Sequence, residues 1–443
     1  MLGSLPNMKK RRTNLLTFLI LLGLVLGALY GEFGLFQQGV SIDGDHWLKQ
    51  AGDLVLIRPL KLLIIPLILF SVIAGISNIG DPAKLGIVGS ATLLYYFATM
   101  LVAVILGTTL VTWIQPGVLA PEIQETLRQS SSVFETASGN AQTLGSSWMN
   151  ILHQIVPTNV FSDMVNGRPL GIIVFAIAIG LALSAGGDKT KVAREACSGA
   201  FEAIMILVHW VIWLTPIGVF FLVAWTVGRI GFNSITGPLG LYMGTVLSGL
   251  FIHGLIVLPF VLWLFTRRQP FRFMWRMKRA LMTAIGTDSS SATLPVTIDA
   301  AENEGECSKR AANFVLPLGA TINMDGTALY EAVAVVFLFQ LFGIELEFSQ
   351  LIIVVITATL AAVGAAGIPS AGLVTMVIVI GAVNSSLTGS NEGPLPVAAI
   401  GIIIGVDRIL DMFRTAVNVW GDAVGAKIIT KLAPDVYAGD KPL

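Results

Sequence analysis

Long apolar segments alternate with short polar ones along most of the chain, and this pattern predicts a helical membrane protein. Six apolar segments precede residue 267, and most approach or exceed the roughly 20 residues that a helix needs to span a bilayer. They cover residues 14–31, 54–79, 88–115, 168–186, 199–228 and 234–266. The stretch 117–150 is rich in Ser, Gln and Glu, and we expect it to be an extramembrane loop.

The second half of the chain contains two broken apolar segments, 275–305 and 350–390. Small residues and a proline interrupt each one midway, and each precedes a long apolar helix that carries acids, at about 309–340 and 394–430. Paired broken segments of this kind indicate inverted repeats in transporters. We therefore interpret both as re-entrant helical hairpins, and the alternative is that each forms ordinary kinked spans.

The distribution of positive charge orients these segments in the membrane. The most basic stretch of the chain follows the sixth segment and contains Arg267, Arg268, Arg272, Arg276, Lys278 and Arg279. No Lys or Arg lies between Arg310 and Arg408. Because positive charge favours the cytoplasmic side, we expect the basic stretch and both termini to be cytoplasmic. A cleaved signal peptide could begin like residues 9–31, but the long first segment favours a retained helix.

Composition agrees with a membrane protein and narrows its chemistry. The 443 residues are 54% hydrophobic and only 12% charged, against about a quarter charged in soluble domains. Net charge is zero, which gives no support to nucleic-acid binding. The two cysteines form no disulfide framework, and the four histidines lack metal-ligand spacing and are expected to be structural or interfacial.

The last predicted helix carries charges on one face only. At about 100° per residue its polar positions occupy an arc of roughly 100°. These positions are Asp407, Asp411, Arg414, Thr415, Asn418 and Asp422. Each charge costs about 2.5–3.5 kcal/mol at the bilayer centre, so the face must meet partners, ions or a ligand. A structural salt-bridge network is the alternative, but spare carboxylates beside one arginine suit cations and a ligand amine.

The preceding helix adds oxygen ligands inside an apolar span. Asn323, Asp325 and Thr327 flank Gly326, a combination that can break a helix and expose carbonyls. Oxygen ligands without His or Cys suit hard cations such as sodium. Glu331 is a further buried acid that could carry a proton.

Five sequence segments together make the chain resemble the glutamate transporter family, the dicarboxylate/amino acid:cation symporters, over nearly its whole length. The segments are PLILFSVIAGI at 66–76, VPTNVF at 156–161, SSSATLPVT at 289–297, NMDGT at 323–327 and GAAGIPSAG at 364–372. The resemblance implies an all-α fold of eight transmembrane helices and two re-entrant hairpins, with inverted repeats, an elevator mechanism and a homotrimer in the cell (plasma or inner) membrane.

The resemblance also implies two domains. Residues 1–270 would be mainly scaffold, with the helices at about 88–115 and 234–266 partly in the transport domain. Residues 271–443 would form the transport core, with hairpin 1 (275–305), helix 7 (309–340), hairpin 2 (350–390) and helix 8 (394–430).

By the family motif, Arg414 would hold the substrate's side-chain carboxylate, Asp411 its amino group and Asn418 its α-carboxylate. The remaining substrate contacts would be Ser289, Ser290, Ser291, Thr327, Ile368, Pro369, Ser370, Ala371, Gly372 and Thr415. Because it has both Arg414 and Asp411, the chain resembles the aspartate and glutamate carriers of the family. C4-dicarboxylate and neutral amino acid symporters of the same fold are the alternatives.

Sodium is the coupling ion that the resemblance implies, with no other cofactor, and proton-only coupling is the alternative. One sodium site would use Gly319, Asn323, Asn418 and Asp422. A second would use Thr321, Ala362, Val363 and Ala365, and a third Tyr96, Thr99, Asn323 and Asp325. Glu331 resembles the glutamate assigned to proton coupling in animal members, where potassium counter-transport often accompanies it.

Two positions depart from the family pattern. Met100 stands where relatives have Ser or Thr, and a thioether is a poor sodium ligand. Asp288 stands where relatives have Ser or Arg, so it would place another negative charge near Asp411, which Arg408 could neutralise. The alternative is that Asp288 simply caps the second arm of hairpin 1. A channel is the main rival function, and the absence of GxSxG with a partnered base disfavours an enzyme.

Overall fold

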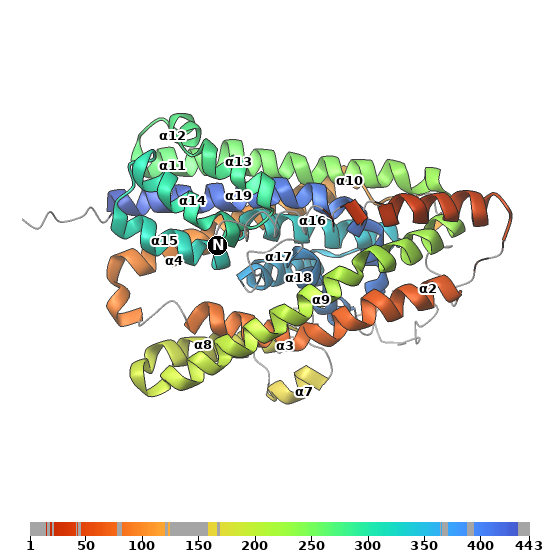
Figure 1. The fold of residues 1–443 in the computed structure, drawn as a ribbon, viewed down its shortest axis with the longest axis horizontal. Coiled ribbons are helices and arrows are strands. Elements are labelled where there is room, and N and C mark those ends of the chain that lie inside the picture. Colours follow the sequence, from red (N-terminus) through yellow and green to blue (C-terminus); the bar gives the residue numbers. More distant parts are fainter. Residues whose placement is uncertain are drawn as a thin grey trace, which may run out of the picture.

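The computed structural model is helical throughout the part of the chain that it describes, and those residues include no strand (Figure 1). The described residues are 15, 18–19, 22–40, 42, 46–77, 82–119, 123–124, 158–165, 169–363, 365, 371–387 and 394–432. Most of the predicted loop at 117–150 lies outside them. Three described helical stretches are long and apolar enough to cross a membrane: Gly89–Ile114, Thr236–Thr266 and Ala311–Leu341.

The first part of the chain builds one group of packed helices. It consists of a helix ending in the π-helical turns η1 (Tyr30–Phe36), α2 (Trp47–Gly52) continued by η2 (Asp53–Ile57), α3 (Arg58–Ser77), α7 (Val160–Val165), α8 (Pro169–Ala185), η3 (Gly187–Thr190) and α9 (Lys191–Ile230). Helix α3 packs against α8 and α9, and η1 and α2 also pack against α9. The first helix continues past the predicted end at Gly31, and Glu32 within it accepts from the backbone N–H of Phe232 at 2.7 Å.

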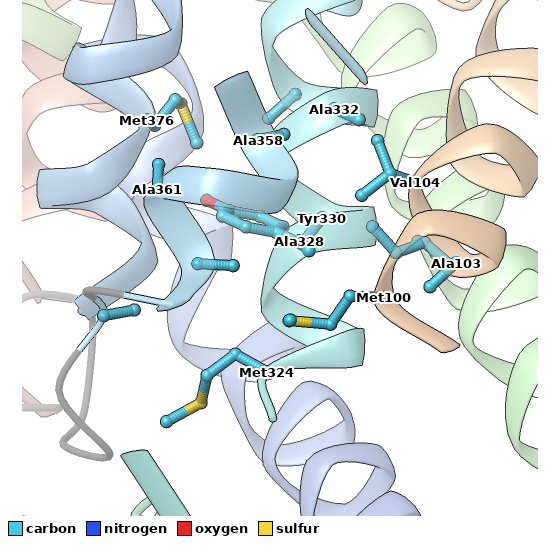
Figure 2. Packing of buried hydrophobic residues seen from close by; sticks show 14 of the residues in the cluster. Met100, Ala103, Val104, Met324, Ala328, Tyr330, Ala332, Ala358, Ala361 and Met376 are labelled. Atoms are coloured by element: carbon cyan, nitrogen blue, oxygen red, sulfur yellow. The ribbon is translucent and has the colours of Figure 1, made fainter. Parts of the chain in front are cut away.

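A second group surrounds α16 (Asp325–Leu341), in which every residue except Gln340 is buried. Helix α4 (Pro82–Ile114) packs along it, and α10 (Phe232–Ile252), η4 (His253–Val257) and α11 (Leu258–Thr266) form one continuous helical stretch beside both. Figure 2 shows the apolar side chains between α4, α16 and the hairpin beyond α16: Met100, Ala103, Val104, Ala328, Ala332, Ala358, Ala361 and Met376.

Both broken segments form helical hairpins. The first has arms α13 (Lys278–Thr287) and α14 (Ser290–Asn303), after the short α12 (Pro270–Arg276), and the second has α17 (Phe348–Val363) and α18 (Ala371–Ser386). The two arms of each hairpin pack together. With 10 and 14 residues in the first hairpin and 16 in each arm of the second, no arm reaches the roughly 20 residues of a membrane span. The kinked-span alternative is therefore disfavoured.

The last helices bring the chain back through the centre of the second group. Helix α15 (Lys309–Ile322) ends at Asn323 and Met324, and α16 begins immediately afterwards, so the predicted helix at 309–340 is interrupted. After η5 (Val397–Ile400), α19 (Gly401–Leu432) packs against α13, α14, α15 and α16. The interruption between α15 and α16 thus lies beside α19.

Close contact between α4 and α16 depends on Gly107, which gives a first prediction. A Cβ at Gly107 would lie 3.0 Å from the Leu329 carbonyl oxygen and 3.1 Å from Val333 Cγ2. Gly107→Leu should therefore force the helices apart and destabilise the protein by about 1–3 kcal/mol, the usual cost of overpacking. Thermal unfolding in detergent measures the loss. Gly244→Leu is the control, since its Cβ would meet no atom within 4 Å, and equal unfolding temperatures for both variants would contradict the prediction.

Candidate functional site

The polar face of α19 points into the protein, as its periodicity predicted. All six stripe residues are buried: Asp407, Asp411, Arg414, Thr415, Asn418 and Asp422. Arg408, beside the stripe, is buried as well. The face meets the interruption between α15 and α16, where short polar side chains compete with helical hydrogen bonds. Gly326 is required there, because a Cβ would lie 2.6 Å from the Arg414 carbonyl oxygen.

Arg414 is paired with two carboxylates on its own helix. Its Nε and Nη2 donate to Asp411 Oδ1 at 3.0 and 2.6 Å, and Nη1 donates to Asp407 Oδ1 at 3.3 Å. The guanidinium carbon lies 4.3 Å from the centroid of the Tyr330 ring, within cation–π range. Gly372, near the start of α18, borders the same group, since a Cβ there would lie 2.7 Å from Nη1. The second hairpin therefore contacts the arginine.

Asn418 joins α19 to the first turn of α16. Its Oδ1 accepts from the backbone N–H of Gly326 at 2.8 Å, and its Nδ2 donates to Thr327 Oγ1 at 3.1 Å and contacts Met324 Sδ at 3.3 Å. Five predicted substrate contacts, on three elements, are thus brought together: Thr327, Gly372, Asp411, Arg414 and Asn418. Thr415 is buried on the same helix, and Ala371 opens α18. The predicted contacts Ile368, Pro369 and Ser370 lie outside the described residues.

The tip of the first hairpin lies against the same helix through an ion pair. Asp288 Oδ2 is 2.5 Å from Arg408 Nη2, and both side chains are buried. The predicted neutralisation of Asp288 by Arg408 is confirmed. The alternative that Asp288 caps the second arm is wrong: Asp288 ends α13 in a left-handed conformation with φ 50°, and Ser289 caps α14 by accepting from Ala292 N–H at 3.1 Å. Ser290 is buried and Ser291 is exposed.

Three of the four residues predicted for the first sodium site, Gly319, Asn323 and Asp422, lie together, whereas Asn418 bonds to the start of α16. Asn323 Nδ2 donates to Asp422 Oδ1 at 2.9 Å. Gly319 borders the same carboxylate so closely that a Cβ would overlap with Asp422 Oδ1 and lie 2.6 Å from the Tyr96 hydroxyl. Asn323 Oδ1 is buried and has no hydrogen-bond partner among the described residues. An unpartnered amide oxygen beside a buried carboxylate and backbone carbonyls fits a hard cation.

The predicted third group centres on Asp325. Thr99 Oγ1 donates to its Oδ1 at 3.2 Å. Tyr96 lies one turn earlier on α4, and its hydroxyl donates to the Val315 carbonyl at 2.6 Å. His253 Nε2 lies 3.0 Å from Asp325 Oδ2, and both side chains are fully buried. Met100 packs in the apolar cluster of α4 and α16 and adds no oxygen.

His253 is the residue that sequence reasoning missed. It was expected to be structural or interfacial because the histidines lie far apart in sequence. Its position inside an apolar membrane span was the available signal, since ionisable residues there usually have a function. The structure also places it at the start of η4, and π-helical turns are frequent at functional sites.

The remaining predicted positions are more dispersed. Thr321 is exposed, and its hydroxyl donates to the Leu318 carbonyl within its own helix. Ala362, Val363 and Ala365 are buried at the end of α17. Among the described residues, no hydrogen bond joins these three to Thr321, so the second sodium site stays a prediction.

Glu331 lies six residues after the start of α16 and is fully buried. One carboxylate oxygen accepts from the Thr375 hydroxyl on α18, and the other has no hydrogen-bond partner among the described residues. A buried carboxyl oxygen without a partner is suited to a proton. Thr375 links this carboxyl to the hairpin that also contacts Arg414.

Comparison with known proteins gives a consistent picture. The model of the sodium:dicarboxylate symporter family matches residues 16–432. Excitatory amino acid transporter 3 of Mus musculus is 41% identical over 456 residues, covering 94% of this chain and 84% of the mouse protein. The human protein of the same name is 38% identical over 94% of this chain and 84% of its own length. An excitatory amino acid transporter of Caenorhabditis elegans is 39% identical, covering 94% of this chain and 88% of its own.

Gly319 allows a direct test of the predicted sodium site. Gly319→Ala should push the new methyl group into the Asp422 carboxylate and the Tyr96 hydroxyl. We expect sodium to stabilise the wild type against thermal unfolding. The variant should need an at least about tenfold higher sodium concentration for half of the stabilisation, a loss of about 1.4 kcal/mol of binding free energy. Gly240→Ala is the matched control, because its Cβ would meet no atom within 4 Å. An unchanged sodium midpoint for Gly319→Ala would place the ion elsewhere.

Proposed function

The chain belongs to the sodium:dicarboxylate symporter family, and we propose that it is a secondary active transporter that couples uptake of aspartate or glutamate to sodium. A transporter of this family is an integral membrane protein. The observation that carries the substrate class is the buried Arg414–Asp411 pair at 2.6 Å. The names of the relatives, excitatory amino acid transporters, support the same class.

The pair matches the two charged ends of an acidic amino acid. A guanidinium binds a carboxylate bidentately, and Arg414 presents a planar fork of donors for this purpose. Asp411 is a carboxylate that accepts hydrogen bonds and suits an ammonium group. Asn418 and Thr327 supply amide and hydroxyl groups beside them for an α-carboxylate. A neutral amino acid would leave Arg414 without its ligand, and a dicarboxylate without an amine would leave Asp411 without one.

Sodium would be held by the oxygen groups beside Asp422 and Asp325. Asn323 adjoins both, since Asp422 accepts from its Nδ2 and a Cβ at Gly421 would contact both Asn323 and Asp325. A cation there would compensate the negative charge of two carboxylates, which is costly to bury in a low-dielectric interior. We assign Glu331 as the candidate proton carrier, because it faces Thr375 on the hairpin next to Arg414.

The moving part of the protein, in this proposal, is the group of helices around α16 and α19. It contains both hairpins and the binding groups, while α3, α8 and α9 pack mainly with one another. This division supports a scaffold in residues 1–270 and a transport core in residues 271–443, with α4 and the 232–266 stretch associated with the core. Elevator movement, a homotrimer and cytoplasmic termini belong to the same proposal.

Uptake of radiolabelled L-aspartate into proteoliposomes tests the function. We expect an inward sodium gradient to drive accumulation by the wild type. Arg414→Ala should reduce it by up to about 100-fold, since a charge-assisted contact contributes up to about 3 kcal/mol. Accumulation driven by a proton gradient alone would move the coupling ion to Glu331. No aspartate uptake under either gradient would overturn the substrate assignment in favour of C4-dicarboxylates or neutral amino acids.

Asp288 should influence the pH dependence of that uptake. It adds a negative charge to a buried cluster that also holds Arg408, Asp411 and Arg414, so its removal changes the charge that the cluster presents to a zwitterionic substrate. Asp288→Ser should shift the pH profile of the initial rate relative to the wild type, measured at saturating sodium. The isosteric Asp288→Asn should shift it in the same sense. Superimposable profiles would show that the pair is only structural.

A further inference from the structure

The basic stretch after α11 carries charges and aromatic side chains that the transport site does not use. From its geometry we infer that the outer surface of α11, α12 and the start of α13 binds the headgroups of anionic phospholipids. We call it the basic–aromatic surface and define it by Trp263, Arg267, Phe271, Arg272, Trp275 and Lys278.

One side of α12 and the residue that follows it pack against the rest of the protein. Phe273 and Met277, four residues apart, are buried. The Phe273 ring lies 5.6 Å from the ring of Trp420 on α19, centroid to centroid, and Lys427 Nζ lies 5.5 Å from its centroid. Because helical side chains four apart share a face, the exposed side chains of Phe271 and Trp275 lie on the opposite side of α12 and point away from the protein. The orientation of the basic–aromatic surface is thereby fixed.

Half of the six cations in the stretch are engaged by carboxylates. Arg276 Nη1 lies 2.7 Å from Glu306 Oε1, and Arg268 lies 3.7 Å from the other oxygen of that carboxylate. Arg279 pairs with Asp299 and, at 3.2 Å, with Glu304. The hydrogen bond from Arg276 lowers the pKa of Glu306, so this carboxylate stays ionised and keeps Arg276 engaged.

The other three cations lie on the outward side and have no carboxylate partner among the described residues. Arg267 and Lys278 each lie over an exposed tryptophan: the Arg267 guanidinium carbon is 4.7 Å from the Trp263 ring centroid, and Lys278 Nζ is 4.5 Å from that of Trp275. Arg272 lies between them along the chain and is exposed. Trp275 is 69% exposed and Phe271 55%.

Exposed tryptophan beside unpaired cations fits the interfacial layer of a bilayer. Indole and phenyl rings settle at headgroup depth, and cations stacked over indoles remain available to phosphate oxygens on their other side. Clusters of Lys and Arg immediately outside a membrane helix attract anionic lipids. A soluble anion would satisfy the charges but would leave the exposed rings in water, so a lipid is the ligand that satisfies both.

Lipid binding is measured directly on the purified full-length chain in neutral detergent, so the result does not depend on transport activity. Phosphatidylglycerol and phosphatidylcholine of equal acyl length are titrated, with native mass spectrometry for binding and thermal unfolding for stabilisation. The test variant combines Arg267→Gln, Arg272→Gln and Lys278→Gln. The control variant combines Lys189→Gln, Lys191→Gln and Arg194→Gln. It removes the same charge from η3 and the first turn of α9, where no tryptophan lies nearby in sequence.

We expect phosphatidylglycerol to bind the wild type and the control variant more tightly than phosphatidylcholine. Each cation removed from the basic–aromatic surface should weaken that binding about fivefold, and all three together about 100-fold. Unchanged phosphatidylglycerol affinity in the test variant would overturn the location. Equal affinities of the wild type for the two lipids would overturn the preference for anionic headgroups.

Binding of soluble glycerol phosphate to the same protein is measured as well. If glycerol phosphate binds the wild type as tightly as the lipid does, the surface is a site for free anions and the inference fails. If the triple variant does not fold, the single variant Arg272→Gln replaces it, because this side chain has no described contact to lose, and the expected decrease is then about fivefold.

Discussion

Each charged side chain of α19 needs a partner inside a membrane protein, and this requirement determines which elements pack against the helix. A charge at the bilayer centre costs about 2.5–3.5 kcal/mol even on the lenient insertion scale. Asp411 and Asp407 pair with Arg414, and Arg408 pairs with Asp288. Asp422 accepts from Asn323, which ends α15. Each partner outside α19 belongs to a different chain interruption, so neutralising one helix draws the tip of the first hairpin and the α15–α16 break onto it.

Interrupted helices supply what these charges need. A continuous helix uses its own N–H and C=O groups, whereas an interruption leaves some of them available inside the protein. The N–H of Gly326 is one such group and donates to Asn418. Glycines at the contacts then allow backbone and charged groups to approach closely: Gly319 lies against Asp422, and Gly372 lies against Arg414. The polar residues and the small residues of these motifs therefore serve the same arrangement.

Periodicity and interruptions allowed the main features to be predicted from sequence. The stripe on α19 follows from helical spacing alone, and the two hairpins follow from small residues inside apolar segments. His253 could not be assigned in this way because its partner Asp325 is 72 residues away on another helix, so only the fold brings them together. The identity of the cap at the first hairpin also escaped sequence reasoning. Asp and Ser are both good caps, so sequence alone does not choose between them. In the structure Asp288 is left-handed and pairs with Arg408, and Ser289 is the cap.

The mutual pairing of Arg414 and Asp411 bears on selectivity more strongly than either residue does alone. Removing one partner of a buried ion pair costs about 3–5 kcal/mol, because the remaining charge is left uncompensated. A ligand that engages Arg414 without offering a cation to Asp411 would incur that cost, and so would an ammonium ligand that leaves Arg414 free. Only a solute carrying an amine and an additional carboxylate replaces both halves of the pair at once. The groups proposed to hold sodium lie elsewhere: Asp422 is two to three turns further along α19, and Asp325 is on α16. Cations at those positions would offset other carboxylates and leave this exchange to the substrate.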